Sequence, residues 1–359
     1  MNRQNTKSVL EKVYDSKMPD LADIEYLLAR QNPEEMEILF DFADEVRHKF
    51  VGDGILLRGI VEFSNYCRNT CSYCGLNKYN KTLPRYRLSQ DEIIAAIKYI
   101  VSTGVKTVVL QSGEDDKLEP YWLRDIIEQI KTNFDIAVTL SVGEWNCTDY
   151  LLWKQAGADR YLLKIETTDQ ALYQNLHPQM SFKNRLECSK NLKMLGYQNG
   201  SGCIVGLKGQ TIRTLAKDIL FFKKENFDMI GIGLFIPHAH TVLGPETPGD
   251  LNLTLKTLAV TRIITKDTHL PATTSIGSAG GCDQRVKALK AGANVIMPNF
   301  TPHPYRSLYE IYPDKRCVNE HFNQYISSLE KTAQTLNRTL DYAKGDSLKR
   351  KYHSDAIHN

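Results

Sequence analysis

Short apolar runs alternate with longer amphipathic stretches along this chain, and the alternation repeats from Ile55 onward. The short runs predict buried strands, and the amphipathic stretches predict helices. The predicted strands are Ile55–Phe63, Thr107–Gln111, Ala137–Ser141, Arg160–Ile165, Ser201–Val205, Met229–Phe235, Ala272–Ile276 and Val295–Pro298. The predicted helices between them include Gln90–Ser102, Leu123–Lys131, Thr211–Lys224, Leu255–Thr265 and Arg285–Ala291.

Glycine follows three of the helical stretches just before an apolar run, at Gly104, Gly157 and Gly292. Glycine tolerates the left-handed conformation that ends a helix, so these positions predict turns into strands. Eight strand–helix units imply a closed parallel α/β fold, the (βα)8 TIM barrel, with its chemistry at the carboxyl ends of the strands. An open doubly wound sheet is the alternative that the pattern leaves open.

The two ends of the chain differ from this repeat. Residues 1–50 are charged, with apolar residues at helical spacing, and predict an N-terminal helical extension that caps the main domain. Residues 51–317 form the predicted barrel. Residues 318–359 predict a C-terminal helix, from about Asn319 to Tyr342, and then a polar tail.

Composition is that of an ordinary globular protein, and a chain of 359 residues can bury a large core without disulfides. The formal net charge is only +3, whereas nucleic-acid binders usually show a stronger basic bias, so we expect no nucleic acid partner. No apolar run approaches the roughly 20 residues that span a bilayer, and Met1 to Asp20 lack the apolar stretch of a secretion signal. We therefore expect a cytoplasmic protein with no membrane partner.

Three of the eight cysteines are concentrated in the segment Cys67-Arg68-Asn69-Thr70-Cys71-Ser72-Tyr73-Cys74, just after the first predicted strand. This C-x3-C-x2-C spacing places three thiolates, the soft ligands that iron–sulfur clusters require, on one short loop. A structural cluster normally takes four cysteines, so three leave one iron of a 4Fe-4S cluster open for another ligand. A zinc site is an alternative, but structural zinc usually has four ligands, and no second C-x2-C or nearby histidine supplies them. Three unrelated buried cysteines are the other alternative.

With Tyr73 before the third cysteine, this spacing resembles the signature of the radical S-adenosylmethionine (SAM) superfamily. The resemblance implies a 4Fe-4S cluster on Cys67, Cys71 and Cys74, whose open iron binds the amino and carboxylate groups of SAM. One electron, from a reductant such as a flavodoxin or ferredoxin, then breaks the sulfonium C–S bond. The resulting 5′-deoxyadenosyl radical attacks a small-molecule substrate. A barrel interior in an anaerobic setting suits this chemistry, because the protein has to orient and shield a reactive species.

The end of the second predicted strand is a candidate for binding SAM, together with Tyr73. Gln111-Ser112-Gly113-Glu114-Asp115 resembles the GGE element of the superfamily, with Ser112 in place of the first glycine. Gln111 belongs to this candidate site, Gly113 permits close backbone approach, and Glu114 can accept hydrogen bonds from the SAM ammonium. An ordinary polar turn is the alternative.

Further candidates for SAM binding follow the later strands. Glu166 can bond the ribose hydroxyls or the ammonium, Arg185 can pair with the carboxylate, and Thr139 and Ser141 offer hydroxyls. The segment from Gly202 to Gly206 resembles the G-x-I-x-G element, which in the superfamily lies beside adenine. Taken singly, each of these residues has a surface or helix-pairing role as its alternative.

Longer phrases, among them Val61-Glu62-Phe63-Ser64-Asn65-Tyr66-Cys67 and Gly143-Glu144-Trp145, resemble the HydE family of radical SAM maturases of iron-only hydrogenases. The resemblance covers about residues 45 to 317, and is weaker to biotin synthase and methylornithine synthase. It implies a substrate below SAM, an iron–dicarbonyl–cyanide–cysteine unit. The lining residues would be Lys164, Met229, Thr273, Thr274, Met297 and Tyr305. Plain core packing is the alternative for the two methionines.

The sequence departs from that family where the substrate would bind. HydE proteins commonly have Arg-His-Glu-Thr where this chain has Lys164-Ile165-Glu166-Thr167, so the charge is kept but the two-pronged guanidinium is lost. The loop from Ser278 to Cys282 also differs. Cys317 has no neighbouring cysteine, so we expect no second cluster. Cys282, His238 and His240 receive no assigned role.

Two other functions remain open. A carbon-skeleton mutase acting on an amino acid, as in methylornithine synthase, would share the cysteines and the SAM-binding elements. An iron–sulfur sensor or carrier would use the same cysteines but would not need Glu166 or Arg185. The order of the SAM-type elements along the chain favours an enzyme.

Overall fold

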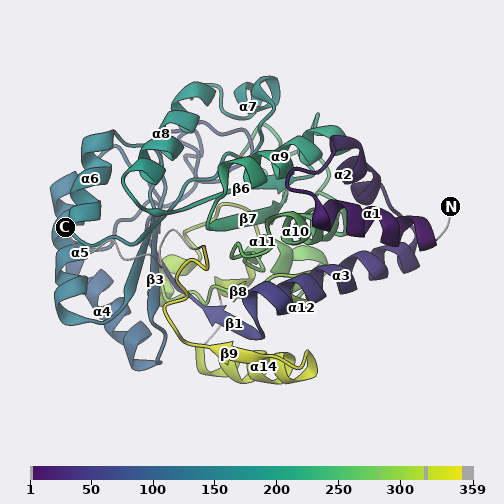
Figure 1. Cartoon of the computed structure of the whole chain (residues 1–359). Helices are drawn as coiled ribbons and strands as arrows, with labels where there is room; N and C mark the ends of the chain where they lie inside the picture. Colours follow the sequence, from purple (N-terminus) through teal and green to yellow (C-terminus); the bar gives the residue numbers. More distant parts are fainter. Residues whose placement is uncertain (1–2, 282, 319–321, 350–359) are drawn as a thin grey trace.

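The computed structural model describes residues 3–281, 283–318 and 322–349, and the strands pair in parallel throughout this part of the chain (Figure 1). A six-stranded sheet has the order β2-β3-β4-β5-β6-β7, and a three-stranded sheet has the order β8-β1-β9. The prediction of an α/β fold with parallel strands is therefore confirmed. The strands are β1 (Gly54–Leu57), β2 (Gly59–Ser64), β3 (Thr107–Ser112), β4 (Ala137–Ser141), β5 (Arg160–Leu162), β6 (Gln198–Val205), β7 (Met229–Leu234), β8 (Val295–Ile296) and β9 (Thr339–Asp341).

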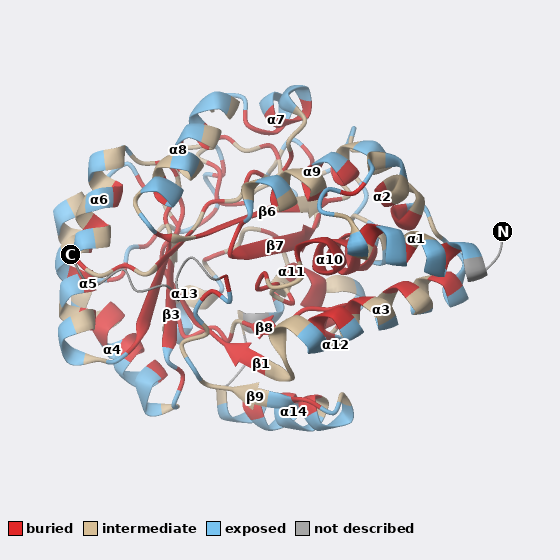
Figure 2. Cartoon of the chain, viewed as in Figure 1, coloured by how far each residue is buried: buried red, intermediate tan, exposed pale blue. Residues whose placement is uncertain are grey.

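The strands of the six-stranded sheet are mostly buried and the helices around them are amphipathic, as Figure 2 shows by colour, whereas β9 is partly exposed. Every residue of β2 and β7 is buried, which is typical of a parallel sheet covered on both faces. Helix α4 begins at a capping box formed by Ser89 and Glu92, and turns its isoleucines inward. The helices that follow strands are α4 (Gln90–Ser102), α5 (Pro120–Asn133), α6 (Cys147–Gln155), α7 (Gln170–Leu176), α8 (Phe182–Met194), α9 (Ile212–Glu225), α10 (Leu251–Thr265), α11 (Thr274–Gly277), α12 (Arg285–Lys290) and α13 (His303–Arg306).

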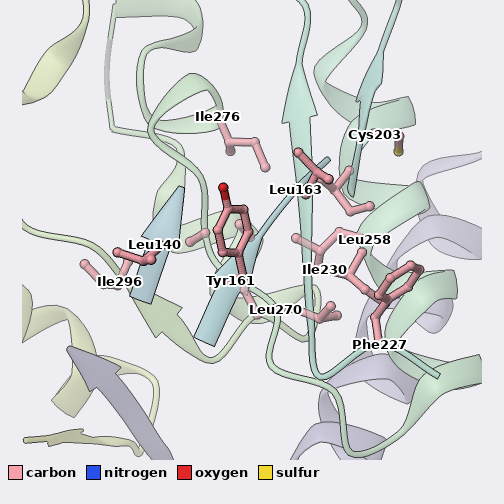
Figure 3. Close-up of a cluster of buried hydrophobic side chains, with 14 of the residues drawn as sticks. Leu140, Tyr161, Leu163, Cys203, Phe227, Ile230, Leu258, Leu270, Ile276 and Ile296 are labelled. Atoms are coloured by element: carbon pink, nitrogen blue, oxygen red, sulfur yellow. The ribbon is translucent and has the colours of Figure 1, made fainter. Parts of the chain in front are cut away.

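The interior of the fold is apolar at the level where the strands run side by side. Figure 3 shows Leu140, Tyr161 and Ile230, which come from β4, β5 and β7 and are each fully buried. Burying one such side chain stabilises the fold by about 1.5–3 kcal/mol. This packing fixes the strands whose carboxyl ends carry the polar residues described below.

Two predicted strands differ from those observed in more than the position of their ends. The run Ile55–Phe63 is divided at Arg58 into β1 and β2, which belong to different sheets. The predicted strand Ala272–Ile276 is wrong, because only the bridge between Pro271 and Val295 forms there and helix α11 follows. Side chains replace the missing ladder: Thr273 Oγ1 donates to the carbonyl of Ile232, and the amide of Leu234 donates to Ser275 Oγ.

Isolated parallel bridges link the two sheets. Ile60 pairs with Asn299 beside β2, and Met229 pairs with His269 beside β7. Together with the bridge at Pro271, they connect each edge of the large sheet to the segments that carry β8.

The helices before β1 pack on the outside of this framework. They are α1 (Arg3–Asp15), α2 (Leu21–Leu28) and α3 (Pro33–Val51), and they contact α9 and α10. Helix α10 is buried at every position from Thr254 to Thr265, because α3 covers one side of it and β7 the other. The described residues before β1 therefore lie mainly in helices.

The chain after the last strand–helix unit departs from its prediction. Helix α14 spans Phe322–Thr335 and not the longer segment to Tyr342, and Thr339–Asp341 form β9 beside β1. Asn337 has φ 52°, the left-handed conformation that ends a helix, so the chain turns there toward the sheet. The start of the predicted helix at Asn319 lies outside the described residues.

The segment from Lys344 to Ser347 crosses the amino ends of the strands. Arg160, fully buried at the start of β5, donates to the carbonyl of Lys344 at 2.8 Å and to Asp346 Oδ1 at 2.6 Å. His269 Nε2 lies 2.9 Å from the carbonyl of Asp346, and its Nδ1 lies 2.9 Å from the side-chain amide nitrogen of Asn294. Because the amide nitrogen donates, the histidine is held neutral with its proton on Nε2.

Stability should depend on pH through His269. Burial, and then the charge of Arg58, lower the pKa of His269 to about 3. Below pH 6.5 the imidazole is therefore protonated in the unfolded chain but stays neutral in the folded chain. Stability should therefore fall as the pH falls from about 6.5 toward 3, by about 1.4 kcal/mol per pH unit for this group. Denaturant unfolding at pH 7 and pH 5 should show that His269→Gln loses about 2 kcal/mol less than the wild type. His303→Gln, at an exposed position, serves as the control, and an equal loss in His269→Gln and the wild type would contradict the assignment.

Candidate active site

The cysteine loop leaves the carboxyl end of β2 and is held by backbone hydrogen bonds to other parts of the fold. The amide of Arg68 donates to the carbonyl of Glu114 at 2.8 Å, and the amide of Ser72 donates to the carbonyl of Leu176 at 2.9 Å. Arg85 ties together the segments on either side of the loop, since its guanidinium donates to the carbonyls of Asn65, Leu76, Asn77 and Asn80. The conformation of the loop is therefore fixed by hydrogen bonds to the rest of the fold.

The three cysteines of this loop line one cavity of about 360 Å³. Burial raises the pKa of all three thiols, that of Cys74 to about 12. The charges of the other two thiolates add to the rise at Cys71, that of Cys67 adds to it at Cys74, and that of Glu114 adds to it at Cys67. Metal binding has to displace these protons, so it should release acid. In the described part of the chain no set of three histidine, cysteine or carboxylate side chains converges on a single ion position. A cubane takes one thiolate at each of three separate irons, and so does not need that convergence.

Most of the residues predicted to bind SAM or substrate line this same cavity. Gly113 cannot be replaced there without a clash, since a Cβ on it would lie 2.2 Å from the carbonyl oxygen of Tyr66 and 2.8 Å from Cys67 Cβ. The predicted residues in the lining are Cys67, Cys71, Tyr73, Cys74, Gln111, Gly113, Glu114, Ser141, Lys164, Glu166, Arg185, Thr273, Thr274 and Met297.

Four predicted residues are not part of the cavity wall. Thr139 is buried on β4, with its hydroxyl lacking a hydrogen-bond partner in the described structure. Gly206, at φ 96°, packs where a Cβ would lie 2.3 Å from Gly249 Cα. Met229 begins β7, where Arg58 Nη1 donates to its sulfur at 2.8 Å. Tyr305 donates to Glu92 Oε1 and packs against Tyr86.

Arg185 lies between two buried carboxylates at the wall of the cavity. Its Nε is 2.7 Å from Glu144 Oε1, and its Nη2 is 3.5 Å from Glu114 Oε1. Burial, together with the charge of Glu114, raises the pKa of Glu144, while the two carboxylates raise the pKa of Arg185. Arg68 Nη2 also lies 3.4 Å from Glu114 Oε2, so two guanidinium groups stand beside the two carboxylates, and the arrangement can receive both an ammonium and a carboxylate. Glu144 belongs to the segment Gly143-Glu144-Trp145 that resembles the family, but nothing in the sequence assigns its side chain to this network.

Lys164 and Glu166 form a second ion pair in the cavity. Lys164 Nζ lies 2.9 Å from Glu166 Oε2, and their side chains are 25% and 12% exposed. Glu166 has φ 63°, a conformation that a residue with a side chain rarely adopts. Such strain often marks a ligand site.

Two further cavity contacts had no signal in the sequence. Lys315 Nζ lies 2.6 Å from Glu62 Oε1, although the residues are 253 positions apart. The Tyr73 hydroxyl lies 3.0 Å from His177 Nε2, and His177 Nδ1 lies 3.0 Å from the carbonyl of Tyr173. The carbonyl can only accept, so Nδ1 carries the proton and Tyr73 donates to Nε2.

The residues present fit a cluster and a nucleoside. Three soft thiols from one loop face a cavity whose wall also has carboxylates, hydroxyls and a glycine that admits close backbone approach. In the cavity wall, the carboxylate oxygen Glu166 Oε2 is buried without an aligned hydrogen bond in the described structure. Unsatisfied polar atoms of this kind are suited to binding a polar ligand.

The remaining candidates are placed elsewhere or are not described. His238 is buried, with Nε2 3.8 Å from Glu310 Oε1, and His240 is exposed beside it. Cys282 lies outside the described residues. None of the described helices combines the length and the apolar character of a membrane span.

Comparison with known proteins shows what the chain is similar to. The profile of the Radical SAM superfamily matches residues 61–222. The chain is 51% identical to the [FeFe] hydrogenase maturase subunit HydE of Thermotoga maritima over 304 residues, which is 84% of this chain and 86% of that protein. It is 30% identical to 3-methylornithine synthase of Methanosarcina acetivorans over 80% of this chain and 81% of that protein. The crystal structure of methylornithine synthase (PylB) superimposes with a TM-score of 0.79 at 25% identity, covering 93% of this chain and 97% of that one.

Proposed function

The chain belongs to the HydE family of the radical SAM superfamily, and we propose that it cleaves SAM reductively to act on a small substrate during hydrogenase maturation. The observation that carries the proposal is the shared cavity, which brings Cys67, Cys71 and Cys74 together with Glu114 and Glu166. The isolated bridges between the sheets support a closed eight-unit barrel around that cavity. A cytoplasmic, oxygen-free setting and a flavodoxin or ferredoxin as reductant complete the proposal.

The three cysteines are the residues that would hold the cluster, with one thiolate at each of three irons. When bound there, the cluster supplies the electron that cleaves SAM to the 5′-deoxyadenosyl radical. The loop has to keep the three thiols at fixed positions. The hydrogen bonds from Arg85 to four backbone carbonyls hold the segments on either side of the loop in place.

The carboxylates and the guanidinium of the cavity would bind the polar groups of SAM. Glu114 and Glu144 offer negative charge to an ammonium, and Arg185 offers positive charge to a carboxylate. Ser141 and Glu166 lie in the same wall and can bond ribose hydroxyls. Gly113 lets the backbone approach the ligand closely, which a side chain would prevent.

The far part of the cavity wall would bind the substrate. Lys164, Thr273, Thr274 and Met297 provide a charge, two hydroxyls and a polarizable thioether. The ammonium of Lys164 is a compact point charge, whereas the guanidinium of an arginine at this position would donate hydrogen bonds to two oxygens at once. We infer that the substrate here carries one compact anionic group.

A cell-free maturation assay tests the assignment. Apo-hydrogenase should gain activity when this chain replaces a HydE in an otherwise complete mixture, and Cys71→Ala should give none. In a parallel reaction the chain receives lysine, SAM and dithionite. A branched isomer of lysine without any gain of hydrogenase activity would favour the mutase, to which the 30% identity and the superposition point. Intact SAM in both reactions would favour a sensor or carrier.

A further inference from the structure

The ion pair between Lys164 and Glu166 spans two parts of the cavity. Glu166 lines the cavity that the three cysteines of the loop also line. Lys164 faces the opposite side, since a Cβ on Gly233 would lie 3.5 Å from Lys164 Nζ and 3.6 Å from Ser275 Oγ. The pair therefore lies between the proposed SAM end and the proposed substrate end.

The backbone at this pair is irregular. The amide of Leu163 donates to the carbonyl of Gly200, and the amide of Glu166 donates to the carbonyl of Gly202. Three residues on one side of the ladder thus match two on the other, which is the arrangement of a β-bulge. The extra residue re-aims the side chains, and Glu166 takes the left-handed conformation at φ 63°. The fold accepts this strain at the point where the two charges enter the cavity.

Three glycines on β6 and β7 make room for the lysine stem. A Cβ on Gly202 would lie 2.8 Å from Lys164 Cε, and one on Gly231 would lie 3.8 Å from the same atom. Gly202 pairs with Gly231 in the sheet, and Gly233 follows two residues later on β7. The lysine side chain therefore lies along a path lined by glycines, which ends beside Ser275.

The pair is also weakly bonded. Glu166 Oε2 is buried and accepts no aligned hydrogen bond in the described structure, although Lys164 Nζ is 2.9 Å away. A charge contact without hydrogen-bond alignment costs less to exchange than a formed hydrogen bond. Either partner can accordingly leave the pair when a ligand offers it a better one.

We propose that this pair couples the two halves of the site, so that SAM and an anionic substrate each strengthen the binding of the other. The inference rests on the proposed function. When ribose hydroxyls engage Glu166, Lys164 loses its partner and its ammonium becomes available to a carboxylate at the Ser275 end. When a carboxylate engages Lys164 first, Glu166 is released toward the ribose. Linkage requires that the two effects have the same size.

The test uses the anaerobically reconstituted wild-type chain with its cluster oxidised, so that no ligand is consumed. L-cysteine is the carboxylate probe and S-adenosylhomocysteine the ribose probe, and titration calorimetry measures each alone and in the presence of saturating amounts of the other. The Kd of L-cysteine should fall about fivefold or more when S-adenosylhomocysteine is bound. The Kd of S-adenosylhomocysteine should fall by the same factor when L-cysteine is bound.

Variants separate coupling from a merely structural role. The Kd of L-cysteine for Glu166→Gln in the absence of S-adenosylhomocysteine should equal its Kd for the wild type in the presence of S-adenosylhomocysteine. This variant should show no coupling between the two probes. Lys164→Met should also show none, whereas Lys164→Arg should retain it. Lys208→Met removes an exposed lysine paired with Glu246 and should leave the coupling unchanged.

Independent binding of the two probes to the wild type would overturn the inference, as would coupling that persists in Lys164→Met. Failure to detect L-cysteine binding in the presence of S-adenosylhomocysteine would overturn it as well. Its failure is distinguishable from failure of the proposed function. Wild-type chain that releases 5′-deoxyadenosine on reduction but shows no coupling disproves only the inference, whereas SAM left intact disproves the proposed function.

Discussion

Replacing Cys71 with alanine should abolish iron binding and SAM cleavage together. Cys71 supplies one of three thiols that face the cavity, and two thiols leave two irons of a cubane without a protein ligand. Iron and sulfide content after anaerobic reconstitution should drop to background in Cys71→Ala, and chromatography should detect no 5′-deoxyadenosine after reduction. The loss should exceed that of any other single substitution discussed, because no residue of the loop besides Cys67 and Cys74 offers a soft ligand that could take the place of Cys71.

The matched control is Cys147→Ser. Cys147 begins α6 and is not part of the cavity lining, so this variant should keep the full iron content and form 5′-deoxyadenosine at the wild-type rate. Wild-type iron content in Cys71→Ala, or equal loss in both variants, would show that the cluster is held elsewhere.

Removing the Arg185 charge should have the second largest effect, on both stability and SAM binding. Arg185→Met removes the cation between Glu144 and Glu114 and leaves beside them only the half-exposed Arg68, whose Nη2 lies 3.4 Å from Glu114 Oε2. The pKa of Glu144, which burial already raises, should rise further in this variant. Breaking a buried pair in this way typically costs 3–5 kcal/mol of stability. A loss of 2–5 kcal/mol in binding corresponds to a Kd for SAM that rises by roughly 30-fold or more. Denaturant unfolding and SAM titration of the reconstituted protein measure the two effects.

Two variants make this experiment specific. Arg185→Lys keeps one positive charge but not the fork, and should recover part of the SAM affinity. Arg124→Met breaks an exposed pair with Asp125 and should change stability by less than about 1 kcal/mol. SAM binding that is equally tight in Arg185→Met and the wild type would remove this residue from the SAM site.

The regular parts of the fold were predictable from local patterns. The helix predicted at Gln90–Ser102 coincides with α4, because its isoleucines repeat at helical spacing and Ser89 and Glu92 cap its start. The strand predicted at Ala137–Ser141 coincides with β4, since its short, mostly apolar run is rich in residues that favour a buried parallel strand. The cysteine loop was predictable because its ligands are adjacent in sequence.

The errors arose where distant contacts override local preference. Arg58 interrupts an apolar run that looks like one strand, and its guanidinium turns to the Gly345 carbonyl and to Met229. At Ala272–Ile276 the hydroxyls of Thr273 and Ser275 bond the β7 backbone, so the chain can turn into a helix. Strand β9 forms because residues near the end of the chain find an open edge beside β1.

The site shows the same division. Cys67, Glu114 and Glu166 could be proposed because each follows a predicted strand, and all three line the cavity. The partner of Lys315 could not be proposed, because Glu62 is 253 residues away and no local motif joins them. The pairing of Arg185 with Glu144 depends in the same way on how α8 packs beside the loop after β4.

The thiols of Cys67, Cys71 and Cys74 should bind three irons of a 4Fe-4S cluster and leave the fourth iron open for SAM. Mössbauer spectroscopy of the anaerobically reconstituted, ⁵⁷Fe-labelled chain tests it directly. We expect about four irons per chain as a 4Fe-4S cluster, with the signal of a single iron site shifting when SAM is added. A cluster whose four irons are all unaffected by SAM, or a chain that takes up zinc and no iron, would contradict the account.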